Sequence, residues 1–252
     1  MPYHFVLHSF IVCCCFLLMA CQPTQSASQQ TKINAHHYDA FWIWGEIKTA
    51  PYLQKAQELY ILQGEIRKNK HTQQLIFIPQ GVRVLNIPRQ KVWLVFRNHE
   101  LNWSQQQLQP ILQRIQHWEN VGNHIQGIQI DFDAKTKNLK EYALFLQQLR
   151  QQLPQKYRLS ITGLLDWTNV KDAETLQCLR ENIDELTIQT YQGSKTIVNY
   201  QTYLMKVSKL NLPYKIGIVQ QGQWDSQLNF ASDPNFKGYV VFLLRDYSNF
   251  TN

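Results

Sequence analysis

The feature that most constrains the fold is a repeated alternation of short apolar runs with longer segments of helical period. Two segments carry a clear helical pattern: 104–119, with Ser104 as a plausible N-cap, and 139–153, which ends before Pro154. The apolar runs have the length and composition of buried strands and occupy residues 40–45, 59–64, 91–98, 127–133, 158–165, 185–192, 214–221 and 238–245. Strands that alternate with helices predict parallel βαβ units, and eight such strands predict closure into a (β/α)8 TIM-type barrel.

The predicted barrel domain, residues 38–252, has about 215 residues, which is near the lower end for this fold. Some helices must therefore be short or missing, and the first two units look the most irregular. A further apolar piece, residues 75–79, is expected to extend the second unit as a hairpin. The formal charge of +7 is dispersed along the chain, and 65–70 is the only short basic cluster, so no nucleic-acid partner is predicted.

The N-terminal segment has the pattern of a secretory signal peptide, predicted as residues 1–20. Residues 5–20 are almost wholly apolar but too short to span a membrane, and they stop at Cys21 before a polar stretch. The sequence "LMAC", residues 18–21, resembles the lipobox of bacterial lipoproteins, which implies acylation of Cys21, for example by palmitate. A plain signal peptide or a different start codon remains the alternative, because no Lys or Arg precedes Phe5.

Lipidation of Cys21 would place the protein in the cell envelope. Residues 21–37 would then form a flexible tether, and Gln22 in place of Asp after the acylated cysteine favours the outer membrane by the lipoprotein sorting rules. The protein is expected to face the periplasm there. Cys13, Cys14 and Cys15 would leave with the signal peptide, so Cys178 alone would remain in the barrel and no disulfide framework is expected.

Neither a cofactor nor a metal site is predicted, and a monomer is expected. His36 and His37 precede the first strand, and His99 with Glu100 follow the third, but their spacing is not that of metal ligands.

Polar side chains stand near the C-terminal end of nearly every predicted strand, where the active sites of such barrels gather. Tryptophans lie near several of these ends, and an exposed indole face among hydrogen-bonding groups suits a sugar ring. Glu65 and Asp166 are among the strand-end groups. The residues predicted to bind substrate are Trp44, Glu46, Arg97, Gln129, Trp167, Gln189, Gln220, Trp224 and Arg245.

The stretch "GIQIDFD", residues 127–133, ends in two carboxylates spaced two residues apart. Residues of equal parity in a strand share a face, so Gln129, Asp131 and Asp133 are expected to face the barrel axis and the apolar residues between them to face the helices. Two carboxylates this close repel each other, so the pKa of one should rise, as general-acid catalysis requires. The alternative is that Asp131 is a structural hydrogen-bonding residue and Asp133 caps the following turn.

The same stretch resembles the fourth-strand signature of family 18 glycoside hydrolases, usually written DGxDxDxE. "ELTIQTYQG", residues 185–193, is similar to their sixth-strand "MTYD" segment, and the order of these pieces agrees over 127–246. The departures are Gln126 and Gln129 in place of the first two aspartates, and Asp133 in place of the acidic glutamate. Because Asp is one methylene shorter, the acid would be displaced by on the order of 1 Å, which can cost about a hundredfold in rate.

A closer similarity, over nearly all of the mature domain, is to bacterial lipoproteins of domain of unknown function 3142. It rests on "FWIWG", on "IDFDAKTKNLKEYALFLQQLR" and on "LSITGLLDW", and Asp131 and Asp133 agree with that family's D-x-D. This resemblance implies no established activity.

Two functions are compatible with these resemblances. The first is a glycan-active hydrolase, similar to chitinases, or a lyase, acting on an amino-sugar-containing glycan. In it Asp133 is the general acid, Asp131 holds or tunes it, and Tyr191 forms a hydrogen bond with the sugar or a reacting carbonyl. The second is a non-catalytic lipoprotein with a degenerate site that binds polysaccharide or peptidoglycan.

Overall fold

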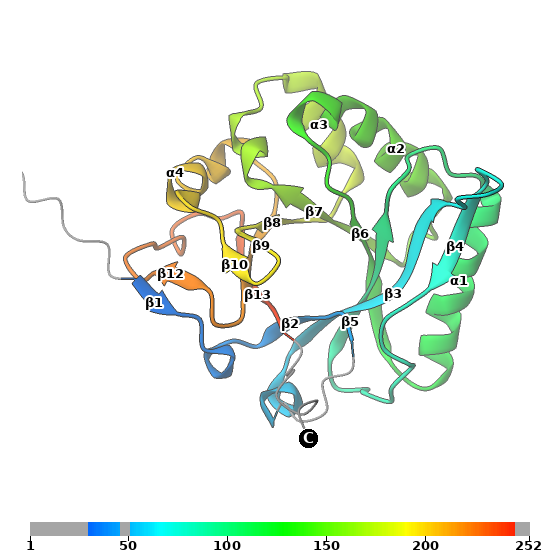
Figure 1. The fold of residues 1–252 in the computed structure, drawn as a ribbon, viewed down its shortest axis with the longest axis horizontal. Helices are drawn as coiled ribbons and strands as arrows, with labels where there is room; N and C mark the ends of the chain where they lie inside the picture. Colours follow the sequence, from blue (N-terminus) through cyan, green and yellow to red (C-terminus); the bar gives the residue numbers. More distant parts are fainter. Residues whose placement is uncertain (1–29, 46–50, 245–252) are drawn as a thin grey trace, which may run out of the picture.

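The computed structural model describes residues 30–45 and 51–244, and at its centre is a closed parallel barrel (Figure 1). In spatial order the barrel strands are β2 (Ala40–Ile43), β3 (Glu58–Lys68), β5 (Lys91–Asn98), β6 (His124–Asp131), β7 (Arg158–Leu164), β8 (Glu185–Gln189), β11 (Tyr214–Val219) and β13 (Phe236–Phe242). The barrel closes because β2 pairs in parallel with both β3 and β13. The predicted (β/α)8 fold and each of its eight strands are thereby confirmed.

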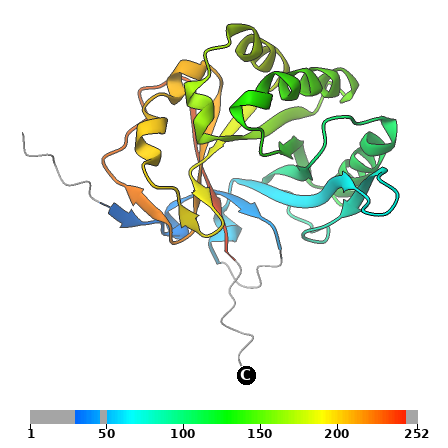
Figure 2. The same cartoon turned by 45° about the horizontal axis from the view of Figure 1, so that its top comes forward.

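Helices flank the arc of the barrel that runs from β5 to β11, as Figures 1 and 2 show. The α-helices are α1 (Gln105–Asn120), α2 (Leu139–Gln152), α3 (Ala173–Asn182) and α4 (Tyr200–Leu204). Short 3-10 helices are η1 (Ala35–His37), η2 (Pro51–Lys55), η3 (Thr136–Asn138), η4 (Leu165–Asn169) and η5 (Val207–Leu210). Helix α1 begins where the sequence predicted, because Ser104 and Gln107 form a capping box that satisfies backbone N–H groups of its first turn.

The first two units are irregular, as expected from the size of the domain. In the described part of the chain, η2 is the only helix between β2 and β3, and the hairpin strand β4 (Leu75–Pro79) takes the place of a helix after β3. Strand β4 pairs antiparallel with β3 outside the barrel ring. The β3–β4 ribbon and α1 therefore pack together beside this part of the barrel, and the Gln107 side-chain amide of α1 donates a 2.9 Å hydrogen bond to Leu75 O of β4.

The predicted tether, residues 21–37, is too long at its C-terminal end. Strand β1 (Gln30–Lys32) pairs antiparallel with β12 (Gln223–Asp225), and Ile33 exchanges backbone hydrogen bonds with Gly222 and Gln221. Ile33 and Ala35 are buried. Residues 30–37 consequently belong to the folded domain, because the apolar side chains of Ile33 and Ala35 pack into its hydrophobic core.

Apolar side chains form two cores, one between the strands and the helices and one inside the barrel. Ile128 and Ile130 of β6 are fully buried in the outer core, and Phe132 packs against it. Inside the barrel lie Ala40, Trp42, Tyr60, Leu62, Trp93, Val95 and Val240. The predicted alternation along β6 is therefore confirmed, and it turns Gln129 and Asp131 toward the barrel axis.

The signal peptide, Cys21, Glu46 and Arg245 lie outside the described residues. Within residues 30–45 and 51–244, no helix is both long and apolar enough to cross a membrane.

Candidate functional site

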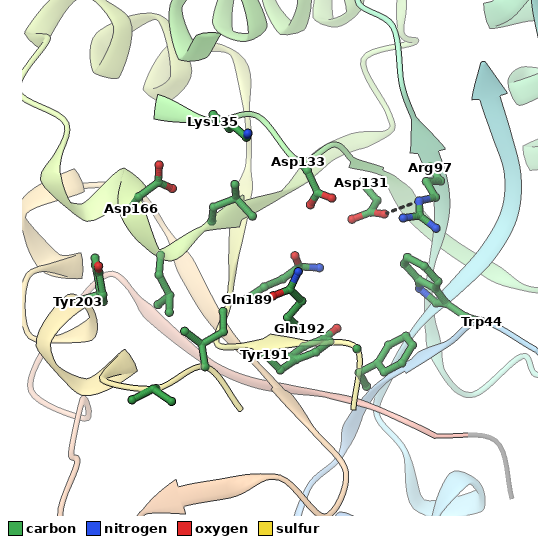
Figure 3. Close-up of a pocket in the computed structure, with 16 residues that line it drawn as sticks. Trp44, Arg97, Asp131, Asp133, Lys135, Asp166, Gln189, Tyr191, Gln192 and Tyr203 are labelled. Atoms are coloured by element: carbon green, nitrogen blue, oxygen red, sulfur yellow. Dashed lines mark ion pairs between the residues drawn. The ribbon is translucent and has the colours of Figure 1, made fainter. Parts of the chain in front are cut away.

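A cavity of about 760 Å³ opens at the C-terminal ends of the barrel strands, and Figure 3 shows the side chains around it. Six of the residues that sequence reasoning assigned to the site line it: Trp44, Arg97, Asp131, Asp133, Gln189 and Tyr191. Asp166, noted as a strand-end carboxylate, lines it as well. The structure thus brings together residues from β2, β5, β6, β7 and β8 and from the segments that follow them.

Asp131 is the last residue of β6 and is almost completely buried at the base of this cavity. Its Oδ1 accepts a 3.0 Å hydrogen bond from the Thr162 hydroxyl group on the neighbouring strand β7. Its Oδ2 lies 3.9 Å from Arg97 Nε, at the outer limit of an ion pair. This carboxylate therefore has one strong neutral donor and one distant cation, which is little compensation for a buried charge.

The electrostatics of Asp131 reflect that poor compensation. The pKa of Asp131 is raised to about 6, mainly by burial and to a smaller extent by the charge of Asp133. The Thr162 hydrogen bond and the charges of Arg97 and His99 oppose the rise. The expectation that one of the two carboxylates has a raised pKa is met at Asp131, and a group with this pKa can exchange a proton near neutral pH.

Asp133 lies just beyond β6 and has an exposed side chain that lines the cavity. In Figure 3 its carboxylate stands between those of Asp131 and Asp166, with Lys135 nearby. Its charge raises the pKa of both Asp131 and Tyr191, so the three groups are within electrostatic range of one another. Asp133 is thus the carboxylate of the pair that a ligand in the cavity meets first.

Aromatic side chains form one wall of the cavity. The Arg97 guanidinium lies over the Trp44 ring, 5.4 Å from its centroid, and the Trp44 ring meets Phe242 edge-on at 5.3 Å. Phe242 in turn stacks on Tyr191 at 5.4 Å. A continuous wall of Arg97, Trp44, Phe242 and Tyr191 offers both flat apolar faces and hydrogen-bond donors to a ligand.

Tyr191 keeps its hydroxyl proton throughout the physiological pH range. Burial, and then the charges of Asp131 and Asp133, raise the pKa of Tyr191 well above 10, whereas a hydrogen bond with the Gln189 side chain lowers it. The phenol therefore stays protonated, and as a cavity-lining group it can donate a hydrogen bond to a ligand.

The structure corrects three predicted substrate-binding residues. Trp167 is buried and donates a 2.7 Å hydrogen bond to Ala134 O, under the helix layer. Trp224 is buried between β1 and the Tyr200 ring, on which it stacks at 5.2 Å. Gln220 accepts a 3.0 Å bond from Leu244 N and is not among the described residues that line the cavity. In each case the chain turns the side chain into the protein after the strand ends, which a position near a strand end does not reveal.

Gln129 faces the barrel axis as predicted but lies below the cavity, where it is completely buried. Its amide oxygen accepts a 2.6 Å bond from Trp42 Nε1, and its amide nitrogen donates to Ser160 at 3.0 Å and to Thr187 at 3.3 Å. Fully engaged in this way, Gln129 supports the floor of the cavity instead of contacting a ligand.

The sequence did not reveal several residues that line the cavity. They are Leu164 at the end of β7 and Phe242 at the end of β13, together with Lys135, Leu165, Gln192, Gly193, Ile197, Val198 and Tyr203 from the segments after β6, β7 and β8. Several come from the small hairpin of β9 (Tyr191–Gln192) and β10 (Lys195–Thr196) and from α4, which packs against η4. Their only sequence signal is that they closely follow strand ends.

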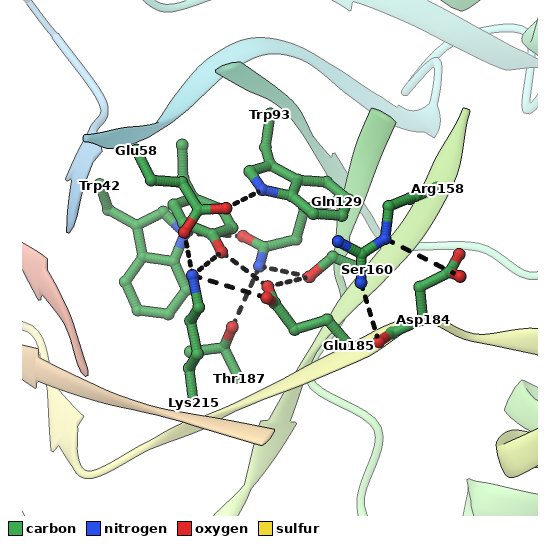
Figure 4. A network of polar contacts seen from close by, with 11 residues as sticks. Trp42, Glu58, Trp93, Gln129, Arg158, Ser160, Asp184, Glu185, Thr187 and Lys215 are labelled. Atoms are coloured by element: carbon green, nitrogen blue, oxygen red, sulfur yellow. Dashed lines mark hydrogen bonds and ion pairs between the residues drawn. The ribbon is translucent and has the colours of Figure 1, made fainter. Parts of the chain in front are cut away.

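At the opposite end of the barrel, a buried charged network fills the interior (Figure 4). Lys215 pairs with Glu58, lies 3.6 Å from Glu185 and donates to Tyr60 Oη at 2.9 Å. Trp93 Nε1 donates to Glu58 at 2.6 Å, and the Tyr60 hydroxyl donates to Glu185 at 2.6 Å. Every charge here has a partner, and this end of a barrel typically serves stability.

A metal centre finds no support in the described part of the chain, where no three His, Cys, Asp or Glu side chains are grouped to hold an ion. His99 Nε2 lies 2.8 Å from Glu65 Oε1, and Arg67 Nε lies 3.8 Å from the same oxygen.

Residues 89–198 match the family described as Domain of unknown function (DUF3142). The matched segment contains Arg97, Asp131, Asp133 and Tyr191, so the resemblance to this family is confirmed for the part of the chain that carries the carboxylate pair. A comparison with curated proteins found no match.

Among solved structures, the chain is similar to the Bacillus cereus spore cortex-lytic enzyme SleL, with a TM-score of 0.50 and 16% sequence identity. The similarity covers 71% of this chain and 50% of the SleL chain, so this protein spans half the length of that structure. At this level of identity the likeness concerns the fold, and it agrees with the distant resemblance to hydrolase barrels seen in the sequence.

Proposed function

We propose that this protein is a glycan-active barrel whose cleft takes an amino-sugar-containing glycan of the cell envelope, such as peptidoglycan. The observation that carries the proposal is the pair Asp131 and Asp133 at the base and mouth of a 760 Å³ cavity with an aromatic wall. That volume is in the range of about 300–1,000 Å³ typical of ligand sites. The name of SleL, a cortex-lytic enzyme, gives independent support for a lytic role on an envelope polymer.

In the proposed reaction, the protonated carboxyl group of Asp133 gives its proton to the oxygen of the glycosidic bond, and that bond breaks as the acetamido oxygen of the substrate bonds to the anomeric carbon. A water molecule then opens this intermediate, releases the sugar and returns a proton to Asp133. The family 18 resemblance implies that the acetamido group of the substrate is the nucleophile, so no second carboxylate on the far side is needed. The carboxylate of Asp131 beneath the sugar then stabilises the positive charge that develops there, and the Tyr191 hydroxyl donates a hydrogen bond to the acetamido oxygen. Trp44 and Phe242 hold the apolar face of the sugar ring.

A non-catalytic glycan-binding protein is the second candidate, and Gln129 is the observation that favours it. This neutral side chain stands where the family 18 signature has a carboxylate, and all its hydrogen bonds are made inside the barrel. The charge beneath Asp131 is therefore absent, while the cavity and its aromatic wall are retained.

The variant Asp133→Asn distinguishes the two candidates. Purified wild-type protein should release reducing ends from peptidoglycan or chitin oligosaccharides, and Asp133→Asn should lose at least a hundredfold in rate while still binding them, because the general acid is removed. Asp39→Asn is the matched control, since Asp39 is an exposed aspartate at the opposite end of β2. Equal rates for Asp133→Asn and wild type would refute the catalytic role of Asp133, and retention of glycan with no cleavage by wild type would favour binding.

Lipid anchoring at Cys21, on the periplasmic side of the outer membrane, is the second part of the proposal. It rests on the sequence "LMAC" and on Gln22. Cells grown with labelled palmitate should label the wild-type protein and the Cys178→Ser variant but not Cys21→Ser. Label that persists in Cys21→Ser would exclude this anchor.

A further inference from the structure

Thr162 lies beside the buried carboxylate and lines no part of the cavity among the described residues. It is a β7 residue, only 2% exposed, and it faces the barrel axis one level above Ser160. Because Gln129 pairs in register with Ser160, the next inward residues, Asp131 and Thr162, stand side by side. This position gives the 3.0 Å contact between the Thr162 hydroxyl oxygen and Asp131 Oδ1.

A second hydrogen bond fixes the direction in which the Thr162 hydroxyl group points. The backbone N–H of Phe132 donates to the same hydroxyl oxygen at 3.3 Å. A hydroxyl group has a single proton and two acceptor positions. With the N–H of Phe132 at one acceptor position, the proton of Thr162 is directed at Asp131 Oδ1.

This arrangement distinguishes the two oxygens of Asp131. A proton placed on Oδ1 would have to be donated to Thr162, and the Thr162 proton would then need another acceptor, which the described residues do not provide. Leaving a buried hydroxyl proton without an acceptor is unfavourable. The oxygen that remains for a proton is Oδ2, which faces Arg97 at 3.9 Å (Figure 3).

The same contacts also hold the chain between the two aspartates. Phe132 is the residue between Asp131 and Asp133, so the bond from its N–H ties the peptide group between them to β7. On the other side of the strand, the Phe132 ring packs against Tyr142 of α2 at 5.0 Å. Thr162 therefore acts on the backbone from which both carboxylates project.

We infer that Thr162 is a positioning residue: its hydroxyl group keeps Asp131 Oδ1 as a hydrogen-bond acceptor and leaves Oδ2 as the oxygen that exchanges a proton with the cleft. The use of that proton in glycan chemistry rests on the proposed function. The control of Asp131 by Thr162 does not, because it follows from contacts within the protein.

The test is a titration of the Asp131 carboxyl carbon by NMR in labelled protein, with the resonance assigned from Asp131→Asn. The wild-type midpoint is expected at about pH 6. Thr162→Val keeps the shape of the side chain but removes a bond that favours the ionised carboxylate, so the midpoint should rise by roughly 0.5–1 pH unit. Thr162→Ser retains the hydroxyl group and should titrate like wild type.

Thr187→Val is the matched control, because Thr187 is an equally buried inward threonine whose hydroxyl accepts from Gln129. Its Asp131 midpoint should equal that of wild type. A Thr162→Val midpoint equal to wild type, or a Thr162→Ser midpoint as high as that of Thr162→Val, would overturn the inference.

A second measurement uses the wild-type protein alone and so does not depend on the folding of a variant. Neutron diffraction below the Asp131 midpoint should place a deuteron on Oδ2, and a deuteron on Oδ1 would refute the inference. Both measurements follow the protonation of Asp131 and not turnover. They therefore test the role of Thr162 even if the protein cleaves no glycan.

Discussion

The two ends of the barrel carry buried charges in opposite states. At the N-terminal end of the strands, Lys215 is shared by Glu58 and Glu185, and neutral donors complete both carboxylates. At the C-terminal end, Asp131 has a like charge beside it and its nearest cation at 3.9 Å. The first arrangement is balanced in the sense that each carboxylate has both a cation and a neutral hydrogen-bond donor, whereas the second is under-compensated and opens into a cavity.

Compensated buried charges hold the fold together, and under-compensated ones are available for chemistry. A balanced cluster stabilises mainly against the loss of one of its members, because each loss leaves an unpaired buried charge. An under-compensated carboxylate destabilises the folded state when it ionises, and its shifted pKa makes it reactive. Removing a charge should therefore have opposite effects on stability at the two ends.

The largest effect is expected for Lys215→Met, at the balanced end. Without the ammonium group, the buried Glu185 and the partly buried Glu58 are left without their cation, and the free energy of unfolding should fall by about 3–5 kcal/mol. Urea unfolding at pH 7 measures this loss. Lys135→Met is the control, since Lys135 is exposed in the cavity and its removal should change stability by no more than about 0.5 kcal/mol. Similar losses in the two variants would contradict the comparison.

The next effect has the opposite sign and concerns Asp131→Asn. The pKa of Asp131 is raised from an ordinary value of 3.8 to about 6 in the folded protein, so the carboxyl favours folding below pH 4 and this benefit is lost as pH rises through 6. At pH 7 the ionised side chain opposes folding, and the Asn variant should be more stable than wild type by about 1–3 kcal/mol.

Urea unfolding of Asp131→Asn and wild type at pH 4 and at pH 7 checks the sign of the stability difference and the pH range over which it develops. The advantage of the variant should shrink toward zero at pH 4. A variant that is less stable than wild type at pH 7 would show that Asp131 is a balanced structural charge like those at the other end.

The smallest effect is expected for Arg97→Met. The Arg97 side chain is 44% exposed and its contact with Asp131 is long, so solvent screens the pair and its worth should be below about 1 kcal/mol. The titration midpoint of Asp131 should therefore rise by less than about 0.7 pH unit, as followed by the NMR of its carboxyl carbon. A fall in the midpoint, or a rise of more than one unit, would mean that the two ends differ less in charge compensation than the geometry indicates.

Most of the fold could be predicted because hydrophobic period is a local property. The eight strands, the hairpin of β4 and the helices α1 and α2 all follow apolar patterns that lie within one segment of the chain. The tether was predicted too long because β1 pairs with β12, and pairing between residues nearly two hundred positions apart has no local signal.

The candidate site could be predicted where strand geometry alone decides, and not beyond. Asp131, Arg97 and Tyr191 were found because residues at strand ends share the mouth of a barrel. Trp167 and Trp224 were assigned to the cavity wrongly, because a loop can turn a tryptophan inward as easily as outward. Ile197, Val198 and Tyr203 were missed because the packing of α4 against η4 brings them to the cavity.

Local sequence patterns specify the barrel and the parity that turns Gln129 and Asp131 toward its axis, because the two-residue period of a strand leaves no other choice once one face is apolar. They also indicate that the carboxylate pair would shift a pKa, but not at which member. The raised pKa lies on Asp131 because of the packing of distant strands, since its burial and its contacts with Thr162 and Arg97 involve residues of β7 and β5.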